Sequence, residues 1–184
     1  ISLRTLREVH LPPYKKAIDA GVYSIMAAHN ELNGVPCHMN KWLMTDVLRD
    51  EFGFNGFYVS DWLDIERINT LHHTANDMKE ASYLSVDAGM DMHMHGPRFL
   101  KPLLKLVEQG RISEARINAA VRPILIAKFR LGLFENAQVD AAAASSIMFN
   151  AQHQQTALEL ARQGIVLLKN DQLLPLTTGQ KIFV

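Results

Sequence analysis

The amino-acid sequence predicts an α/β fold in which parallel strands alternate with helices. Apolar, β-branched segments begin near residues 22, 56 and 90, at intervals of about 34 residues, and each is followed by a loop and a helical pattern. This rhythm is typical of parallel sheets, because a crossover helix must return the chain before the next strand can run in the same direction. Three such units in a row fit part of a (β/α)8 barrel or a doubly wound sheet. Both bind ligands at the carboxyl ends of their strands.

Each expected element has its own local signals. Apolar positions at helical spacing, often closed by glycine, indicate the helices, and runs of β-branched and aromatic residues indicate the strands. Asn40 and Ser113 stand where helix N-caps are expected. The expected elements are, in order, helix 3–21, strand 22–28, helix 41–53, strand 56–60, helix 76–89, strand 90–94, helix 97–110 and helix 113–134.

The composition changes after Phe134, which suggests a domain boundary. Residues 135–150 are small, polar and rich in alanine, and we expect a linker there, although an alanine run is also compatible with a helix. Residues 151–164 have a helical pattern and residues 165–170 a strand pattern, so residues 151–184 are expected to begin a second domain. The chain starts on Ile1 without an initiator methionine and stops in the apolar run "KIFV", so we expect a partial sequence.

Composition excludes few functions but favours an ordinary globular protein. The 184 residues include 19 Lys and Arg and 19 Asp and Glu, so the formal net charge is zero. This balance gives no electrostatic reason to expect nucleic acid or a membrane surface as partner. The single cysteine, Cys37, cannot form a disulfide within the chain. No apolar run approaches the roughly 20 residues of a membrane span.

The segment "GFYVSDW", residues 56–62, brings a carboxylate to the end of an expected buried strand. Asp61 follows the strand directly and Trp62 comes next, while His29 and His93 occupy the ends of the two other strands. A carboxylate at this place either caps the next helix or takes part in catalysis, and cap preference alone favours the first interpretation. Trp62 taken alone would more often be core than a binding surface.

The paired histidines invite a metal interpretation. His72 adjoins His73, and His93 is two residues before His95. An H-x-H pair alone is a weak signal, however, and no cysteine or acidic partner stands at ligand spacing. We therefore expect no metal and no other cofactor.

Six ordered segments, which cover essentially the whole chain, resemble glycoside hydrolase family 3, the β-glucosidase and β-xylosidase family. They are "SIMAAHNELNGVPCHMN", "LMTDVLRDEFGF", "GFNGFYVSDW", "DAGMDMHM", "KFRLGLFE" and "ARQGIVLLKNDQLLPL". The resemblance implies that Asp61 is the catalytic nucleophile and that Trp62 lines the sugar-binding pocket. His29 stands where many members have a tyrosine that hydrogen-bonds near the nucleophile, so it is a further candidate for substrate binding.

The resemblance also implies a reaction and a domain plan. Retaining hydrolysis of terminal β-linked glucosides or xylosides would proceed through a covalent glycosyl-Asp61 intermediate. Residues 1–134 would be the C-terminal part of a (β/α)8 barrel, 135–150 a linker and 151–184 the start of an α/β sandwich domain. The general acid usually comes from that second domain, so this chain is expected to lack it. The expected partner is a β-linked oligosaccharide or glycoside, and the expected location is the periplasm or the exterior.

Two other functions stay open on the sequence alone. One is a non-catalytic carbohydrate-binding or structural segment. The other is a receiver-like domain, which presents a phospho-accepting aspartate at the end of a parallel strand. That interpretation needs an acidic pair after an early strand, whereas the strand before Asp61 ends on "AAHN".

Overall fold

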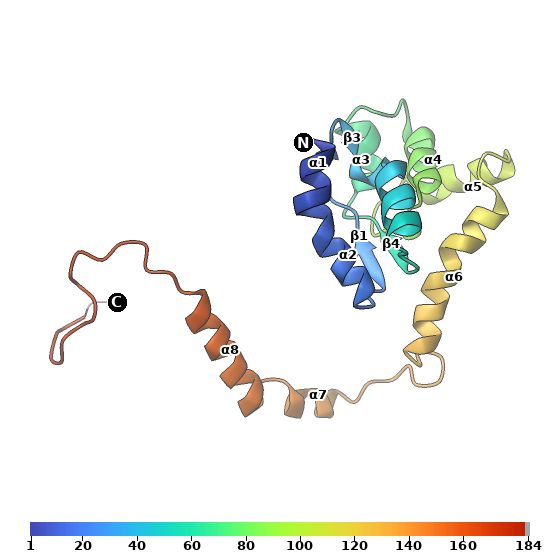
Figure 1. Cartoon of the computed structure of the whole chain (residues 1–184). Helices are drawn as coiled ribbons and strands as arrows, with labels where there is room; N and C mark the ends of the chain where they lie inside the picture. The colour runs from blue at the N-terminus through green and yellow to red at the C-terminus, as the bar shows by residue number, and fades with distance from the viewer. Residues whose placement is uncertain (183–184) are drawn as a thin grey trace. The chain divides into compact units, whose positions relative to one another are not determined.

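The computed structural model describes residues 1–182, which fall into two units, one of Ile1–Glu135 and one that begins at Asn136 (Figure 1). The first unit mixes helices with short strands, so the predicted α/β fold is confirmed. Its elements are α1 (Leu3–Thr5), η1 (Leu6–His10), α2 (Leu11–Asp19), β1 (Ser24–Met26), β2 (Glu31–Leu32), β3 (Val35–Pro36), η2 (Cys37–Met39), η3 (Trp42–Glu51), β4 (Phe57–Val59), α3 (Asp64–Thr70), α4 (Met78–Ala88), α5 (Leu100–Glu108) and α6 (Glu114–Arg130).

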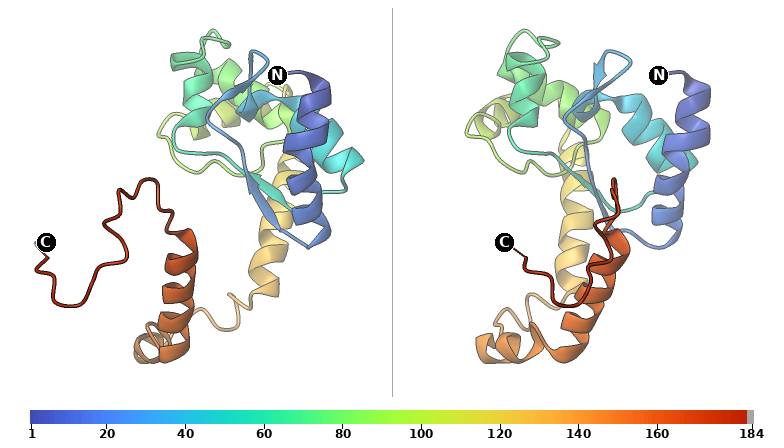
Figure 2. Two further views of the ribbon diagram at one scale, coloured as in Figure 1. Left: turned by 60° about the vertical axis from the view of Figure 1, so that its left-hand side comes forward. Right: turned by 90° about the vertical axis from the view of Figure 1, so that its left-hand side faces the viewer.

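The centre of the first unit is a parallel strand pair. Strand β1 pairs with β4 in the register Ser24 to Phe57 and Met26 to Val59, and Figure 2 shows the two strands side by side with α2 along them. The strand expected at residues 90–94 is wrong: the structure has only isolated parallel bridges, from Val59 to Met92 and from Trp62 to His95. These two bridges are separated along the chain, so they do not form the continuous ladder of hydrogen bonds that makes a strand.

The two predicted helix caps are confirmed. The Asn40 side chain accepts a hydrogen bond from the Leu43 N–H at 3.0 Å, and the Ser113 hydroxyl accepts one from the Arg116 N–H at 3.2 Å. The helix expected at 41–53 is present as η3, which is wound as a π-helix. Three features of the first unit were not predicted: helix α3, which follows Asp61, the β2–β3 hairpin in the loop after β1, and the short helix η2.

A buried core holds β4 against the helices around it. Tyr58 is fully buried, and its hydroxyl donates to the Met44 carbonyl at 2.8 Å. The side chain of Asp91 is also buried, and it pairs with Arg49 at 2.5 Å and with Arg116 at 3.2 Å, while its Oδ2 accepts from the Tyr58 N–H at 3.0 Å. These contacts fix the carboxyl end of β4, where Asp61 lies.

The second unit, taken by itself, is helical. Residues 141–147 of the expected linker form helix α7, and the helix expected at 151–164 is confirmed as α8 (Ala151–Gly164). The strand expected at 165–170 is absent, because its exposed residues, with Leu168 at 92% exposure, have no strand to pair with in the described residues. Of the terminal run 181–184, residues 183 and 184 lie outside the described residues. None of the described helices has the length and apolar character that crossing a membrane requires.

Candidate active site

Asp61 lies just beyond the end of β4, and each of its carboxylate oxygens contacts a nitrogen atom. Its Oδ1 accepts from the Trp62 N–H at 2.6 Å, and its Oδ2 lies 2.9 Å from Nε2 of His29. Its own main-chain N–H donates to Nε2 of His38 at 2.9 Å. The side chain remains 26% exposed, so a ligand can reach it. A carboxylate held in this way stays oriented while it is open to solvent.

His29 follows β1 and faces Asp61 across the strand ends. Its ring lies between two carboxylates, because Nδ1 is 2.5 Å from Oδ2 of Asp64 while Nε2 contacts Asp61. The side chain is 55% exposed. The expectation that the ends of neighbouring parallel strands share one site is therefore met for His29 and Asp61.

Asp64 is a buried carboxylate three residues after Asp61. It is the first residue of α3 and only 2% exposed, and its Oδ1 accepts from Nη1 of Arg67 at 2.8 Å. A tight turn places it there: Leu63 has φ +60°, a left-handed conformation that is uncommon for leucine, and its N–H donates to the His95 carbonyl at 3.1 Å. A negative charge in the first turn of a helix is also favoured by the helix dipole.

His38 contacts Asp61 and Asp64 from the buried side of the site. Its Nε2 accepts the Asp61 N–H, so the proton of the neutral ring lies on Nδ1, which is 3.5 Å from Oδ2 of Asp64. Burial lowers the pKa of His38 to about 4, although the charges of Asp64 and Asp61 oppose this shift. His38 is therefore neutral at ordinary pH and serves as a hydrogen-bond acceptor behind the site.

Trp62 presents its indole beside Asp61. The side chain is exposed, and one face of the ring stacks on His95 at 3.8 Å between centroids with an interplanar angle of 12°. An exposed aromatic face is a suitable surface for the C–H groups of a sugar ring. The stacking fixes the indole and leaves its other face for a ligand.

The other histidines do not form one metal site. His72 contacts Glu31 at 2.8 Å, His93 contacts Glu66 at 3.3 Å, and His95 stacks on Trp62. Donor atoms of His29, Asp61 and Asp64 do lie within 4.8 Å of one another. The Arg67 guanidinium already supplies a cation there, bonded to Asp64 and 3.2 Å from Nδ1 of His29. We treat this cluster as an ion-paired network.

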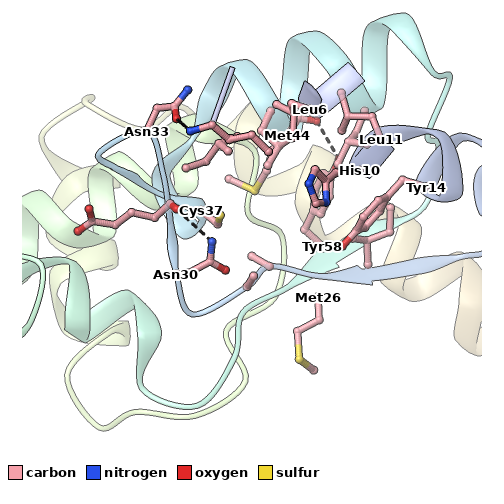
Figure 3. Close-up of a pocket in the computed structure, with 18 residues that line it drawn as sticks. Leu6, His10, Leu11, Tyr14, Met26, Asn30, Asn33, Cys37, Met44 and Tyr58 are labelled. Atoms are coloured by element: carbon pink, nitrogen blue, oxygen red, sulfur yellow. Dashed lines mark hydrogen bonds between the residues drawn. The ribbon is translucent and has the colours of Figure 1, made fainter. Parts of the chain in front are cut away.

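The structure also has an apolar pocket that Asp61 does not line. It has a volume of about 450 Å³ and is lined mainly by apolar side chains from the N-terminal helices, β1 and the loop after β1. Figure 3 shows His10, Leu11 and Tyr14 on one side of it and Cys37 and Asn30 on the other. Cys37 is buried, and burial raises the pKa of its thiol, so it has no features of a reactive cysteine.

Sequence reasoning named three of the residues in this cluster and missed four. The structure brings Asp61, Trp62 and His29 together, as expected from strand ends. Three of the missed residues, His38, Asp64 and Arg67, were not considered at all, and His95 was considered only as part of a possible metal-binding pair. The spacing of Asp64 and Arg67, three apart in a helix, was a readable signal, but the helix itself was not predicted.

A hydrogen-bonded carboxylate at the carboxyl end of a parallel strand stands where enzymes with α/β folds have their active sites. Comparison with known proteins identifies the family. Residues 1–127 match the family described as the glycosyl hydrolase family 3 N terminal domain. The chain therefore belongs to glycoside hydrolase family 3.

Named relatives agree with this assignment. The chain is 42% identical to a β-xylosidase of Formosa agariphila, over 98% of its own length and 26% of that protein. It is 37% identical to a periplasmic β-glucosidase of Salmonella typhimurium, over its full length and 25% of that protein. The solved β-glucosidase from Listeria innocua superposes with a TM-score of 0.87 at 36% identity, over 96% of this chain and 25% of that one. The chain thus spans about a quarter of the length of these relatives.

Proposed function

We propose that this chain is part of a retaining β-glycosidase in which Asp61 is the covalent nucleophile. The observation that carries the proposal is the environment of the Asp61 carboxylate: it is solvent-accessible, accepts a hydrogen bond from the Trp62 N–H, lies 2.9 Å from Nε2 of His29 and is next to an exposed indole. In the reaction, one oxygen of Asp61 forms a bond to the anomeric carbon while the bond to the leaving oxygen breaks. Water then hydrolyses the glycosyl ester and the carboxylate is restored.

The general acid comes from outside this chain. Retaining enzymes hold their two carboxyl groups about 5–5.5 Å apart, and Asp64 is near enough to Asp61 to be considered. Asp64 is buried, however, and its oxygens already contact Arg67 and His29. A carboxylate beneath the surface and ion-paired in this way cannot deliver a proton to a leaving group. The acid is therefore expected in the part of the enzyme for which the relatives have additional length.

The first unit fits part of a (β/α)8 barrel. Strand β1 pairs in parallel with β4, and β4 makes a parallel bridge to Met92. Helices lie between these segments along the chain. In the described residues β1 is paired on one side only, and the apolar pocket lies along it. A further barrel strand beside β1 would cover this apolar surface. On this basis residues 1–134 are the C-terminal part of the barrel, 135–150 a linker and 151–184 the start of a second domain.

Relatives suggest the substrate class and the location. The named relatives are β-xylosidases and β-glucosidases, one is called periplasmic, and a mutant of the Listeria innocua enzyme has been solved in complex with laminaribiose. A terminal β-linked glucoside or xyloside is accordingly the proposed substrate, in the periplasm or outside the cell.

The test is covalent trapping in an enzyme of the relatives' length that contains this chain, called the full-length enzyme below. Incubation with a 2-fluoro β-glycoside should add one glycosyl group to the peptide that contains Asp61, as read by mass spectrometry. Asp61→Ala should abolish the adduct, whereas Asp46→Ala, at an exposed position on η3, should leave it unchanged. A glycoside that binds without forming any adduct would support the non-catalytic alternative. An adduct on another residue would exclude Asp61 as nucleophile.

A further inference from the structure

Trp62 and His95 form an exposed stacked pair beside the proposed nucleophile. Their ring centroids are 3.8 Å apart and the ring planes differ by 12°. Both side chains are exposed, Trp62 by 52%. Two flat rings at this separation touch over their faces, and such a contact stabilises their relative orientation. The stack is therefore a contact between two solvent-facing rings and not a part of the hydrophobic core.

We propose that His95 is a positioning residue for substrate binding, because its ring holds the Trp62 indole in the orientation that receives a sugar ring. The inference deepens the proposed function and rests on it. An indole without this support would change rotamers in solvent, and binding would then have to order it, which weakens affinity. A stack that forms before the ligand arrives removes this cost.

The main chain of His95 is tied to the same strand end that carries the indole. Trp62 and His95 form a parallel bridge, and the Leu63 N–H donates to the His95 carbonyl at 3.1 Å. The buried hydroxyl of Ser60 accepts a hydrogen bond from the Met94 N–H at 2.9 Å. The segment that carries His95 is thus bonded to residues on both sides of the proposed nucleophile, so the two stacked rings share one support.

A second set of contacts holds this segment against helix α3. The His93 ring lies 3.3 Å from Oε2 of the buried Glu66 and stacks on Phe99 at 4.5 Å between centroids. Gly96 passes directly over the same carboxylate, since a Cβ at this position would lie 1.7 Å from Oε1 of Glu66. His95 therefore lies between two residues that are both held in place. Its ring is a fixed surface on which the indole can rest.

The His95 ring acts through its flat face. In the part of the chain that the structure describes, its side chain makes no ion pair and no hydrogen bond, and its directional contact is the stack on Trp62. The role should therefore pass to another flat ring of similar size and be lost with an aliphatic side chain. This expectation separates a stacking role from one that depends on the imidazole nitrogens.

The test measures kcat and KM of the full-length enzyme with a 4-nitrophenyl β-glycoside. His95→Ala should raise KM about two- to tenfold and leave kcat nearly unchanged, because the stack contributes to binding and not to the bond-breaking step. His95→Phe should restore KM, whereas His95→Leu, which has bulk but no flat face, should not. His73→Gln, at an exposed histidine outside the stack, is the control and should leave both constants unchanged.

A Trp62→Ala background separates this role from a general structural one. Once the indole is absent, His95→Ala should leave KM where Trp62→Ala alone sets it, because the two residues act as one unit. A direct readout comes from 5-fluorotryptophan in the full-length enzyme, with the Trp62 resonance assigned by its loss in Trp62→Phe. In fluorine NMR this resonance should sharpen in His95→Ala, as the indole gains rotational freedom, and keep its width in His95→Phe.

Three results would overturn the proposal. They are a wild-type KM in His95→Ala, a further rise of KM in the Trp62→Ala background, and a Trp62 resonance that His95→Ala leaves unchanged. Should His95→Ala fail to fold, His95→Leu carries the same comparisons. The NMR readout does not depend on catalysis. Normal turnover by Asp61→Ala would therefore remove the proposed nucleophile while the role of His95 is still decided by the Trp62 resonance.

Discussion

His38 predicts a specific dependence of stability on pH. Burial lowers its pKa in the folded protein from 6.5 to about 4. Below pH 6.5 the unfolded chain therefore binds a proton that the folded chain refuses, so stability is complete above this pH and falls as pH drops toward 4. For these two values, the loss between pH 8 and pH 5 amounts to about 2 kcal/mol.

The perturbation is His38→Gln, which removes the titrating group. A glutamine can still accept the Asp61 N–H, because its Oε1 can occupy the place of Nε2. The assay is the melting temperature of the full-length enzyme and of the variant between pH 4.5 and 8. Relative to wild type, the variant should gain roughly 4–8 °C between pH 8 and pH 5 if the cooperative unit has 150–250 residues. Other groups titrate in both proteins and cancel in the difference.

A control substitution tests whether the effect is specific to His38. His73→Gln, at an exposed histidine outside the apolar pocket, is the control substitution and is measured over the same pH window. If the difference for His38→Gln is flat, His38 does not remain neutral in the folded state. The assignment of its proton to Nδ1, and its role as acceptor for Asp61, would then be wrong.

Three further substitutions test the site and its support. Asp61→Ala should lower kcat by several orders of magnitude, with partial rescue by azide; near-normal turnover would exclude the nucleophile assignment. Trp62→Ala should lower kcat/KM for an aryl β-glycoside about tenfold, mainly through KM, since it removes a stacking surface; unchanged kinetics would place the indole outside the binding surface. Asp91→Asn should lower the free energy of unfolding by about 3 kcal/mol, because it leaves Arg49 and Arg116 without their buried partner; a denaturant midpoint equal to wild type would contradict this.

Sequence patterns predicted the features of the fold that neighbouring residues determine. The periods of the helices, the caps at Asn40 and Ser113 and the strand that carries Asp61 were all readable, because each is fixed by neighbouring residues. Two expected strands did not form. Residues 90–94 make an isolated bridge to β4 without a continuous ladder, and residues 165–170 have no strand to pair with in the described residues. Their composition favoured strands, but composition cannot supply a continuous ladder of pairs.

The site also depends on structure that the sequence pattern does not reveal. Asp64 reaches His29 only because Leu63 adopts a left-handed conformation and turns the chain directly from strand end to helix, and no pattern of apolar residues signals that turn. The pair also explains why His29 is not simply a substitute for tyrosine. A tyrosine hydroxyl is a single donor, so it can satisfy Asp61 or Asp64 but not both. The buried carboxylate would then depend on Arg67 alone. His29 contacts both carboxylates at once, with Nε2 2.9 Å from Asp61 and Nδ1 2.5 Å from Asp64, so this one ring bridges the two side chains.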